Sequence, residues 1–189
     1  MKDDLELVGE VLKGNVNAFE EIIERYEMGI ANFIYSIIKD KTTTEDLTQE
    51  VFIVVYKKLY TFSKEYKFST WLYQIARNKA IDYLRKCRRH NEVDIQDVCV
   101  TSREMSPESF AEFRETKTLI QQFIKTLNEI DKEILTLRYC KDTLTFKEIA
   151  EVVDMGESAV KKRYYKIYEK YERFIEGKNN CLQKISSNL

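Results

Sequence analysis

Proline and glycine are scarce in this sequence, with one proline and five glycines among 189 residues. An all-β protein needs many tight turns, and these two residue types supply most of them. The composition therefore excludes an all-β fold and indicates helices. Hydrophobic residues make up 43% of the chain and aromatic residues 12%, which is enough for a packed core and excludes disorder as the overall state.

Metal ligands and catalytic groups are also few. The chain has one histidine, His90, and its four cysteines, at positions 87, 99, 140 and 181, form no CxxC pair. We therefore expect no metal site and no disulfide framework, with the cysteines as small apolar fillers. The sequence also lacks a phosphate-binding glycine loop and a Ser/His/Asp set, so it predicts a protein without a cofactor and without catalytic activity of its own.

Long apolar runs are missing as well. No stretch approaches the roughly eighteen apolar residues of a membrane span. The first twenty residues are acidic and contain no apolar run behind a basic start, so we expect no signal peptide. The sequence predicts a cytoplasmic protein that does not insert into a membrane.

Charge is balanced overall but unevenly distributed. The chain has 31 basic and 32 acidic residues, a formal net charge of −1, which argues against indiscriminate binding to nucleic acid. Residues 1–30 and 91–116 each have a net charge of −5, whereas residues 57–90 have +8 and residues 157–178 have +3. Positive charge concentrated in this way is the electrostatic footprint of a nucleic-acid-binding surface.

The acidic segment at residues 91–116 divides the chain. It contains the only proline, Pro107, together with serine and threonine, and it has no sustained helical periodicity. We interpret it as a flexible linker. The sequence thus predicts an all-α protein of two small helical domains, residues 1–90 and 117–178, followed by a loose tail at 179–189. A solvated loop inside one domain is the alternative.

Two helices are predicted early in the first domain. Apolar residues recur every three or four positions from Ala18 to Ile38, and a second helix follows at 44–60 with Thr42 and Glu45 as a capping box. One face of this second helix carries an isoleucine among polar groups, and a face of this kind suits a protein partner. A merely solvated face is the alternative. The residues of this face are Asp46, Gln49, Glu50 and Ile53.

The basic segment is also aromatic, with eight aromatic residues between positions 56 and 83. Basic side chains can hold phosphates while aromatic rings stack on unpaired bases. A third helix is predicted at 69–89, capped by Ser69 or Thr70. A core role for the tryptophan is the alternative to base stacking. One face of this helix carries Trp71, Gln74, Asn78, Asp82 and Arg85.

The second domain begins with two short helices between residues 119 and 137. A helix-turn-helix is predicted next, with a short helix at 146–153, a break at 154–156 and a longer helix. Its alternative is a helix pair in a bundle that does not bind DNA. On the longer helix, Val160, Tyr164, Ile167 and Tyr171 share one side and are expected to face the core. Lysines and a tyrosine then face outward, which suits insertion into a major groove with phosphate anchoring.

Both halves of the chain resemble the extracytoplasmic-function (ECF) group of bacterial sigma factors, which contain only sigma domains 2 and 4. The first half is similar to domain 2 in DLTQEVF (46–52) and FSTWLYQIARNKAIDYLR (68–85). The second half is similar to domain 4 in EILTLRY (133–139), KEIAEVV (147–153) and AVKKRYYKI (159–167). Several motifs in this order are more specific than a helix-turn-helix alone.

The resemblance implies a promoter-specificity subunit of RNA polymerase. Asp46, Gln49, Glu50 and Ile53 would bind core RNA polymerase at the clamp helices of its largest subunit, and the flap is a further implied contact. The first domain would capture the −10 element of promoter DNA as a single strand, with a flipped base held near the loop at 61–68. The second would read the −35 element as duplex. An anti-sigma factor, possibly membrane-bound, is the implied regulator.

The implied DNA contacts fall into two sets. Those for the −10 element are Phe62, Lys64, Phe68, Trp71, Gln74, Arg77, Asn78 and Arg85, with Phe62 and Asn78 at the flipped base. Those for the −35 element are Lys161, Lys162, Arg163, Tyr165 and Lys166.

The helix-turn-helix departs from the family pattern at three positions. Ala159 stands where threonine is usual, Lys162 where serine is usual, and Asp154 where the turn usually has glycine. The −35 sequence therefore cannot be copied from relatives. Before the second helix of the domain, Leu127-Asn128 replaces the usual Leu-Pro.

Two other classes of function compete with a sigma factor. The first is an autonomous helix-turn-helix regulator that binds duplex DNA alone, with residues 1–90 as a sensor or dimerisation domain. The second is a helical protein-interaction module that does not touch DNA.

Overall fold

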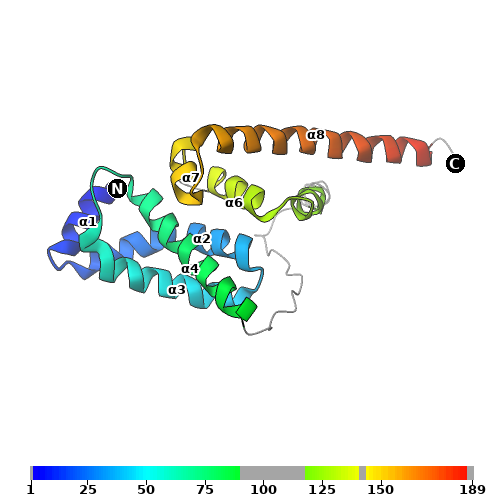
Figure 1. Ribbon diagram of the computed structural model, residues 1–189. Coiled ribbons are helices and arrows are strands. Elements are labelled where there is room, and N and C mark those ends of the chain that lie inside the picture. The colour runs from blue at the N-terminus through cyan, green and yellow to red at the C-terminus, as the bar shows by residue number, and fades with distance from the viewer. Residues whose placement is uncertain (1, 90–117, 141–143, 187–189) are drawn as a thin grey trace, which may run out of the picture.

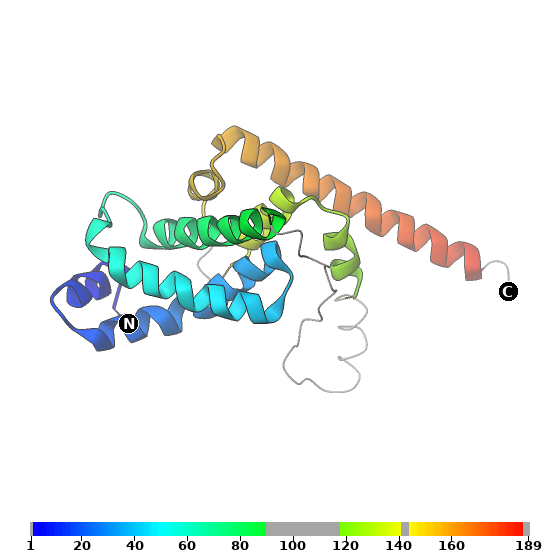
Figure 2. The ribbon, with the colours of Figure 1, turned by 60° about the horizontal axis from the view of Figure 1, so that its bottom comes forward.

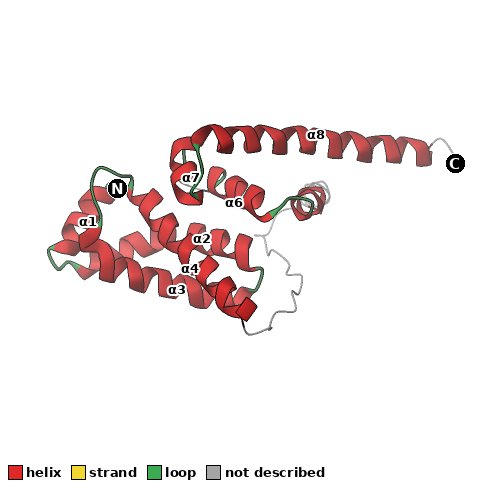
Figure 3. Cartoon of the chain, in the orientation of Figure 1, coloured by secondary structure: helices red, strands yellow, loops and turns green. Residues whose placement is uncertain are grey.

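The computed structural model describes residues 2–89, 118–140 and 144–186, and in these ranges it contains helices and connecting segments but no strand (Figure 3). The all-α prediction is confirmed. The predicted linker at 91–116 lies outside the described residues. Besides the helical residues 118–125, the elements are α1 (Asp4–Leu12), α2 (Val16–Ile38), α3 (Lys41–Lys58), a 3-10 turn η1 (Leu59–Thr61), α4 (Phe68–Arg89), α6 (Glu129–Arg138), α7 (Phe146–Val153) and α8 (Glu157–Ser186).

Helix α2 is the centre of the first half, residues 2–89. Its apolar stripe is buried along the whole helix, and α1, α3, α4 and the second half all pack against it (Figure 1). Sequence periodicity predicted α2 but not α1. Helix α1 is held by a capping box between Asp3 and Glu6 and by the Asp4 carboxylate, which pairs with Arg25 at 2.6 Å and accepts a hydrogen bond from Tyr26 at 2.5 Å.

Helices α2 and α4 approach each other closely at Gly29. A Cβ atom built on Gly29 would lie 2.6 Å from Oη of Tyr73. The Tyr73 side chain is 1% exposed and packs edge-on against Phe33, with ring centroids 5.5 Å apart. Because Tyr73 has little room to move, the absence of a side chain at position 29 fixes how closely the two helices pack.

Two of the predicted helix starts were wrong. Helix α3 begins at Lys41 rather than Thr44, because the Asp40 carboxylate accepts a hydrogen bond from the Thr43 backbone N–H at 2.8 Å and caps the helix before the Thr42 box can. Hydrogen bonding from the Thr43 side chain, and then from this backbone N–H, lowers the pKa of Asp40. In α4 the first residue is Phe68, so Ser69 and Thr70 are inside the helix and their side chains are buried.

The second half, residues 118–140 and 144–186, has the predicted order of helices. Asn128, which replaces the usual proline, caps α6 by accepting from the Asp131 backbone N–H at 2.9 Å. Thr145 and Glu148 form a capping box that starts α7. Asp154, at the break before α8, adopts a left-handed conformation with φ of 56°. Aspartate tolerates this region better than most residues, so the turn forms without the usual glycine.

The end of the chain differs from the expectation. A loose tail was predicted from residue 179, whereas α8 continues to Ser186 and extends away from the other helices (Figure 1). Once a helix has formed, each further residue is added at little cost. No proline interrupts residues 157–186, so a polar sequence there does not end the helix.

The two halves pack against each other. Helix α6 lies against α2, and α7 lies against α4 (Figures 1 and 2). Buried residues from both halves, from Leu7 to Val160, belong to one continuous hydrophobic cluster. Among the helices described, none is long and apolar enough to cross a membrane.

Candidate DNA and protein interfaces

Three aromatic rings meet where the loop at 62–67 enters α4. The ring centroids of Phe62 and Phe68 are 5.5 Å apart, those of Phe62 and Trp71 are 5.5 Å apart, and those of Phe68 and Trp71 are 5.9 Å apart. Phe68 is fully buried, whereas Phe62 and Trp71 are half-buried against the core. Phe68 is therefore a core residue that supports the other two rings, and only Phe62 and Trp71 have surface for stacking.

A hollow of about 420 Å³ lies beside this loop. It is lined by Asp3, Asp4, Leu5, Lys64, Glu65, Tyr66, Lys67 and Phe68. Phe62 and Asn78, the residues expected at a flipped base, do not line it. Asn78 is exposed two helical turns beyond Trp71, about 10.5 Å along the axis of α4. This hollow is therefore not the pocket with Phe62 and Asn78 as walls that the sequence led us to expect.

One face of α4 is engaged by the second half of the chain. Arg77 Nε donates to a carboxylate oxygen of Glu133 at 2.7 Å, and Gln74 Nε2 donates to the backbone carbonyl of Glu151 at 3.2 Å. Lys67, just before the helix, pairs with Glu148 at 3.3 Å. Among the predicted −10 residues, Lys64, Asn78 and Arg85 are exposed, and Arg85 pairs with Asp82 at 3.3 Å.

The expected protein-binding face of α3 is open. Asp46, Gln49 and Glu50 are exposed, and Ile53 is 54% exposed, an unusual degree for an isoleucine. Glu50 accepts a hydrogen bond from Lys79 of α4 at 2.8 Å. All four residues thus lie on one accessible helix surface, as their spacing predicted.

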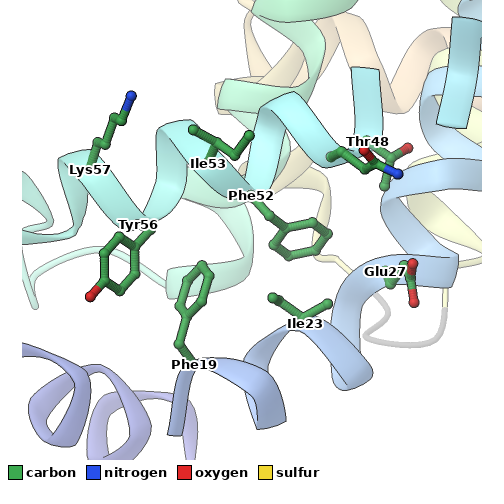
Figure 4. A pocket seen from close by; sticks show the side chains of 9 residues that line it. Phe19, Ile23, Glu27, Thr48, Phe52, Ile53, Tyr56 and Lys57 are labelled. Carbon is green, nitrogen blue, oxygen red and sulfur yellow. The ribbon is translucent and has the colours of Figure 1, made fainter. Parts of the chain in front are cut away.

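This face borders an apolar groove between α2 and α3 with a volume of about 460 Å³ (Figure 4). Its lining residues are Phe19, Ile23, Glu27, Thr48, Gln49, Phe52, Ile53, Tyr56 and Lys57. Sequence analysis missed the groove because it assigned Tyr56 to the aromatic, basic segment. The available signal was the i, i+3 spacing of Ile53 and Tyr56, which puts two exposed apolar side chains next to each other on α3.

The outward face of α8 is basic, as predicted. Lys161, Lys162, Tyr165 and Lys166 are exposed, while Val160 and Ile167 are buried. Lys161 pairs with Glu157 one turn earlier at 2.6 Å, and this hydrogen bond raises the pKa of Lys161. The ring of Tyr165 lies near those of Phe146 and Tyr164, so α7 supports it.

Arg163 differs from its lysine neighbours because it is turned toward α6. Its guanidinium donates to the Asp131 carboxylate at 2.9 Å, and that carboxylate is only 6% exposed. Lys170 lies 3.8 Å from the other carboxylate oxygen. Arg163 therefore fixes α8 against α6 in this structure and does not present its charge with the outward lysines.

A helix-turn-helix with a basic outer face, joined to a helical unit with aromatic and basic groups, is typical of DNA-binding proteins with two contact regions. Sequence comparison agrees with this class. Residues 22–90 match the profile of the family described as Sigma-70 region 2. Residues 63–173 also match a family described as a protein of unknown function (DUF722), which assigns no role.

Full-length relatives extend the match to both halves. The chain is 34% identical to the ECF RNA polymerase sigma factor SigM of Bacillus subtilis, over 75% of this chain and 85% of SigM. It is 30% identical to SigW of the same organism, over 84% of this chain and 89% of SigW. The chain therefore belongs to the ECF family of RNA polymerase sigma factors, which are transcription initiation factors.

The fold is also similar to that of a sigma factor whose structure has been solved. A crystal structure of the sigma factor RpoE in complex with the anti-sigma factor NepR from Bartonella quintana aligns with a TM-score of 0.65 and 18% identity, over 84% of this chain and 96% of that one.

Proposed function

We propose that this sigma factor directs RNA polymerase to promoters through three separate surfaces. The face of α3 with Asp46, Gln49 and Ile53 binds the core enzyme. The loop before α4 and the exposed part of α4 hold the −10 element as a melted strand. The outward face of α8 binds the −35 element in the major groove.

One observation carries the proposal: the acidic and apolar exposed surface is on α3, whereas the basic exposed surface is on α8. The exposed face of α3 combines carboxylates with an exposed isoleucine, a composition that repels DNA phosphates and suits a protein surface. The exposed residues of α8 are lysines and a tyrosine, which suit phosphate anchoring. Core binding and DNA binding are thus expected to respond to different substitutions.

Transcription reconstituted with purified core polymerase tests the proposal. Asn78→Ala should abolish open-complex formation while binding to core polymerase in a pull-down is unchanged. Asn32→Ala is the matched control, because Asn32 is also an exposed helical asparagine but lies on α2. Equal loss of core binding and open complexes with Asn78→Ala would contradict the assignment. Failure of the unaltered chain to support initiation at any defined start site would contradict the function itself.

We further propose that an anti-sigma factor holds this chain inactive. Support comes from the groove between α2 and α3, which offers apolar surface next to the core-binding face, and from the similarity in fold to RpoE, which was crystallised with the anti-sigma factor NepR. An inhibitor bound in the groove would compete with polymerase. Ile53→Asp should weaken inhibitor and core binding together, whereas Tyr56→Ala should weaken the inhibitor more.

A further inference from the structure

Two tyrosine hydroxyls meet at the edge of the helix-turn-helix. Oη of Tyr139, the residue after α6, lies 3.1 Å from Oη of Tyr164 on α8. Tyr139 is 72% exposed, whereas Tyr164 is half-buried. Each phenol has one proton to donate, and the contact between them uses only one of the two. Among the described residues, the Tyr139 hydroxyl has no second hydrogen-bond partner, so the pair keeps one donor for an acceptor outside the protein.

The surroundings of Tyr164 indicate which hydroxyl keeps its proton free. The hydrogen bond with Tyr139, followed by burial, raises the pKa of Tyr164, while smaller effects of the charge of Arg138 and of a hydrogen bond from it lower that pKa. A guanidinium can only donate, so Arg138 occupies the acceptor side of Tyr164. The Tyr164 proton is then directed to the Tyr139 oxygen, and the free donor is the exposed Tyr139 O–H. Hydrogen bonds in such a chain polarise one another, which strengthens the last donor.

Contacts from three helices hold this chain of donors in place. Nη1 of Arg138 donates to the backbone carbonyl of Leu144 at 2.8 Å, and its guanidinium carbon lies 4.9 Å from the ring centroid of Phe146 on α7. The same ring packs edge-on against Tyr164, with centroids 5.2 Å apart. The donor is therefore positioned before any ligand arrives, which reduces the entropy that binding costs.

Tyr164 lies at the border of the outward face of α8. At 3.6 residues per turn it is about 60° around the helix from Lys161, whose side chain is exposed. The major groove of B-DNA is about 12 Å wide, and a helix with its side chains is about 10–12 Å across. A helix that fills the groove has phosphates along both of its flanks. With α8 in the groove, the two hydroxyls would lie beside the backbone of one strand.

A phosphate oxygen suits this donor better than a base edge does. Hydrogen bonds to phosphate oxygens come from hydroxyl side chains as well as from cations, and they fix the position of a protein on the duplex. The outward helix of this chain has lost two hydroxyls that are usual in the family, because Ala159 replaces threonine and Lys162 replaces serine. The tyrosine pair supplies a hydroxyl donor from a different place, the junction of α6 and α8.

We propose that Tyr139 and Tyr164 form an uncharged site for a DNA backbone phosphate beside the −35 element, with the Tyr139 hydroxyl as the donor to the phosphate oxygen. The proposal rests on the assignment of the outward face of α8 to duplex DNA under the proposed function. An uncharged donor releases no counterion from DNA when it binds. The site therefore adds affinity that depends neither on base sequence nor on salt, in contrast to the lysines next to it.

Tyr139→Phe tests the site, because it removes only the hydroxyl of an exposed side chain. The full-length chain is titrated into a fluorescein-labelled, mixed-sequence DNA duplex at several salt concentrations, and anisotropy gives the affinity. We expect binding about fivefold weaker at every salt concentration, with an unchanged salt slope and melting temperature. Lys161→Ala should instead lower the slope by about one. Tyr60→Phe is the matched control, because Tyr60 is 76% exposed on η1 and should change neither quantity.

A double-mutant cycle separates the pair from its two members. Tyr164→Phe removes the hydroxyl that polarises Tyr139 and should also weaken binding, but the double variant should bind no more weakly than Tyr139→Phe alone, because the two hydroxyls act as a unit. Unchanged affinity in Tyr139→Phe would overturn the site, and so would an equal loss in Tyr60→Phe. If the tyrosine variants weaken binding but Lys161→Ala leaves the salt slope unchanged, the phosphate site stands and the assignment of the α8 face fails.

Discussion

Gly29→Ala should destabilise the protein although alanine is the better helix former. In an open helix interior, replacing glycine with alanine stabilises by about 1 kcal/mol. At position 29 the added Cβ would lie 2.6 Å from Tyr73 Oη, which is closer than real Cβ contacts, so one of the helices must shift. Overpacking of this kind costs about 1–3 kcal/mol. We therefore expect a net loss of about 1 kcal/mol, from these two opposing terms.

Gly9→Ala is the matched control. Gly9 is inside α1, and a Cβ there meets nothing within 4 Å. This variant should gain about 1 kcal/mol, so the two alanine variants differ by about 2 kcal/mol in urea unfolding and by several degrees in melting temperature, at about 2–4 °C per kcal/mol for a chain of this size.

A double-mutant cycle identifies the cause. Tyr73→Phe removes the oxygen that the new Cβ meets, so the penalty of Gly29→Ala should largely disappear in the phenylalanine background, with a coupling of about 2 kcal/mol. Equal stabilisation by Gly29→Ala and Gly9→Ala would refute the reasoning. An undiminished penalty in the phenylalanine background would place the clash elsewhere.

Three further variants test the other surfaces. Replacing Lys161 and Lys162 by alanine should reduce transcription from promoters that need the −35 element and lower the salt slope of holoenzyme binding by about two, and an unchanged slope would remove this face from DNA contact. Asp46→Ala should weaken binding to core polymerase in a pull-down while leaving the melting temperature unchanged; lost stability would instead make the residue structural. Asp131→Asn should lower the free energy of unfolding in urea by about 1–2 kcal/mol, because it weakens the pairing with partly exposed Arg163, and no change would show that the pair adds nothing.

Periodicity was sufficient to predict the helices other than α1, but it misplaced the starts of α3 and α4. The apolar stripes of α2 and α8 identify which side of each helix faces the core, because burial repeats every three to four residues. The start of α3 was misplaced because two capping signals overlap within six residues, Asp40 and the Thr42–Glu45 box, and the sequence does not rank them. Helix α1 was missed because its buried stripe consists of only Leu7, Val8 and Val11.

In the candidate site, groupings within one helix could be predicted from the sequence, whereas contacts between helices could not. Residues on one helix face, such as Asp46 and Gln49, could be grouped from spacing because one helix fixes their relation. The pairing of Arg77 with Glu133 joins residues 56 positions apart across the predicted domain division, and no local pattern encodes it. Arg163 was grouped with its lysine neighbours as an expected −35 contact, but the partner that turns it inward, Asp131, belongs to another helix.

The ion pairs alter the interpretation of the basic segment at 57–90. The segment 57–90 has a net charge of +8 in sequence, yet Lys67, Arg77 and Lys79 each have an acidic partner outside the segment. Two of those partners, Glu148 and Glu133, belong to the second half, and the third, Glu50, belongs to α3. Because affinity for DNA grows with the number of phosphates that a surface can neutralise, the net charge of the segment overstates the charge that this conformation offers to DNA.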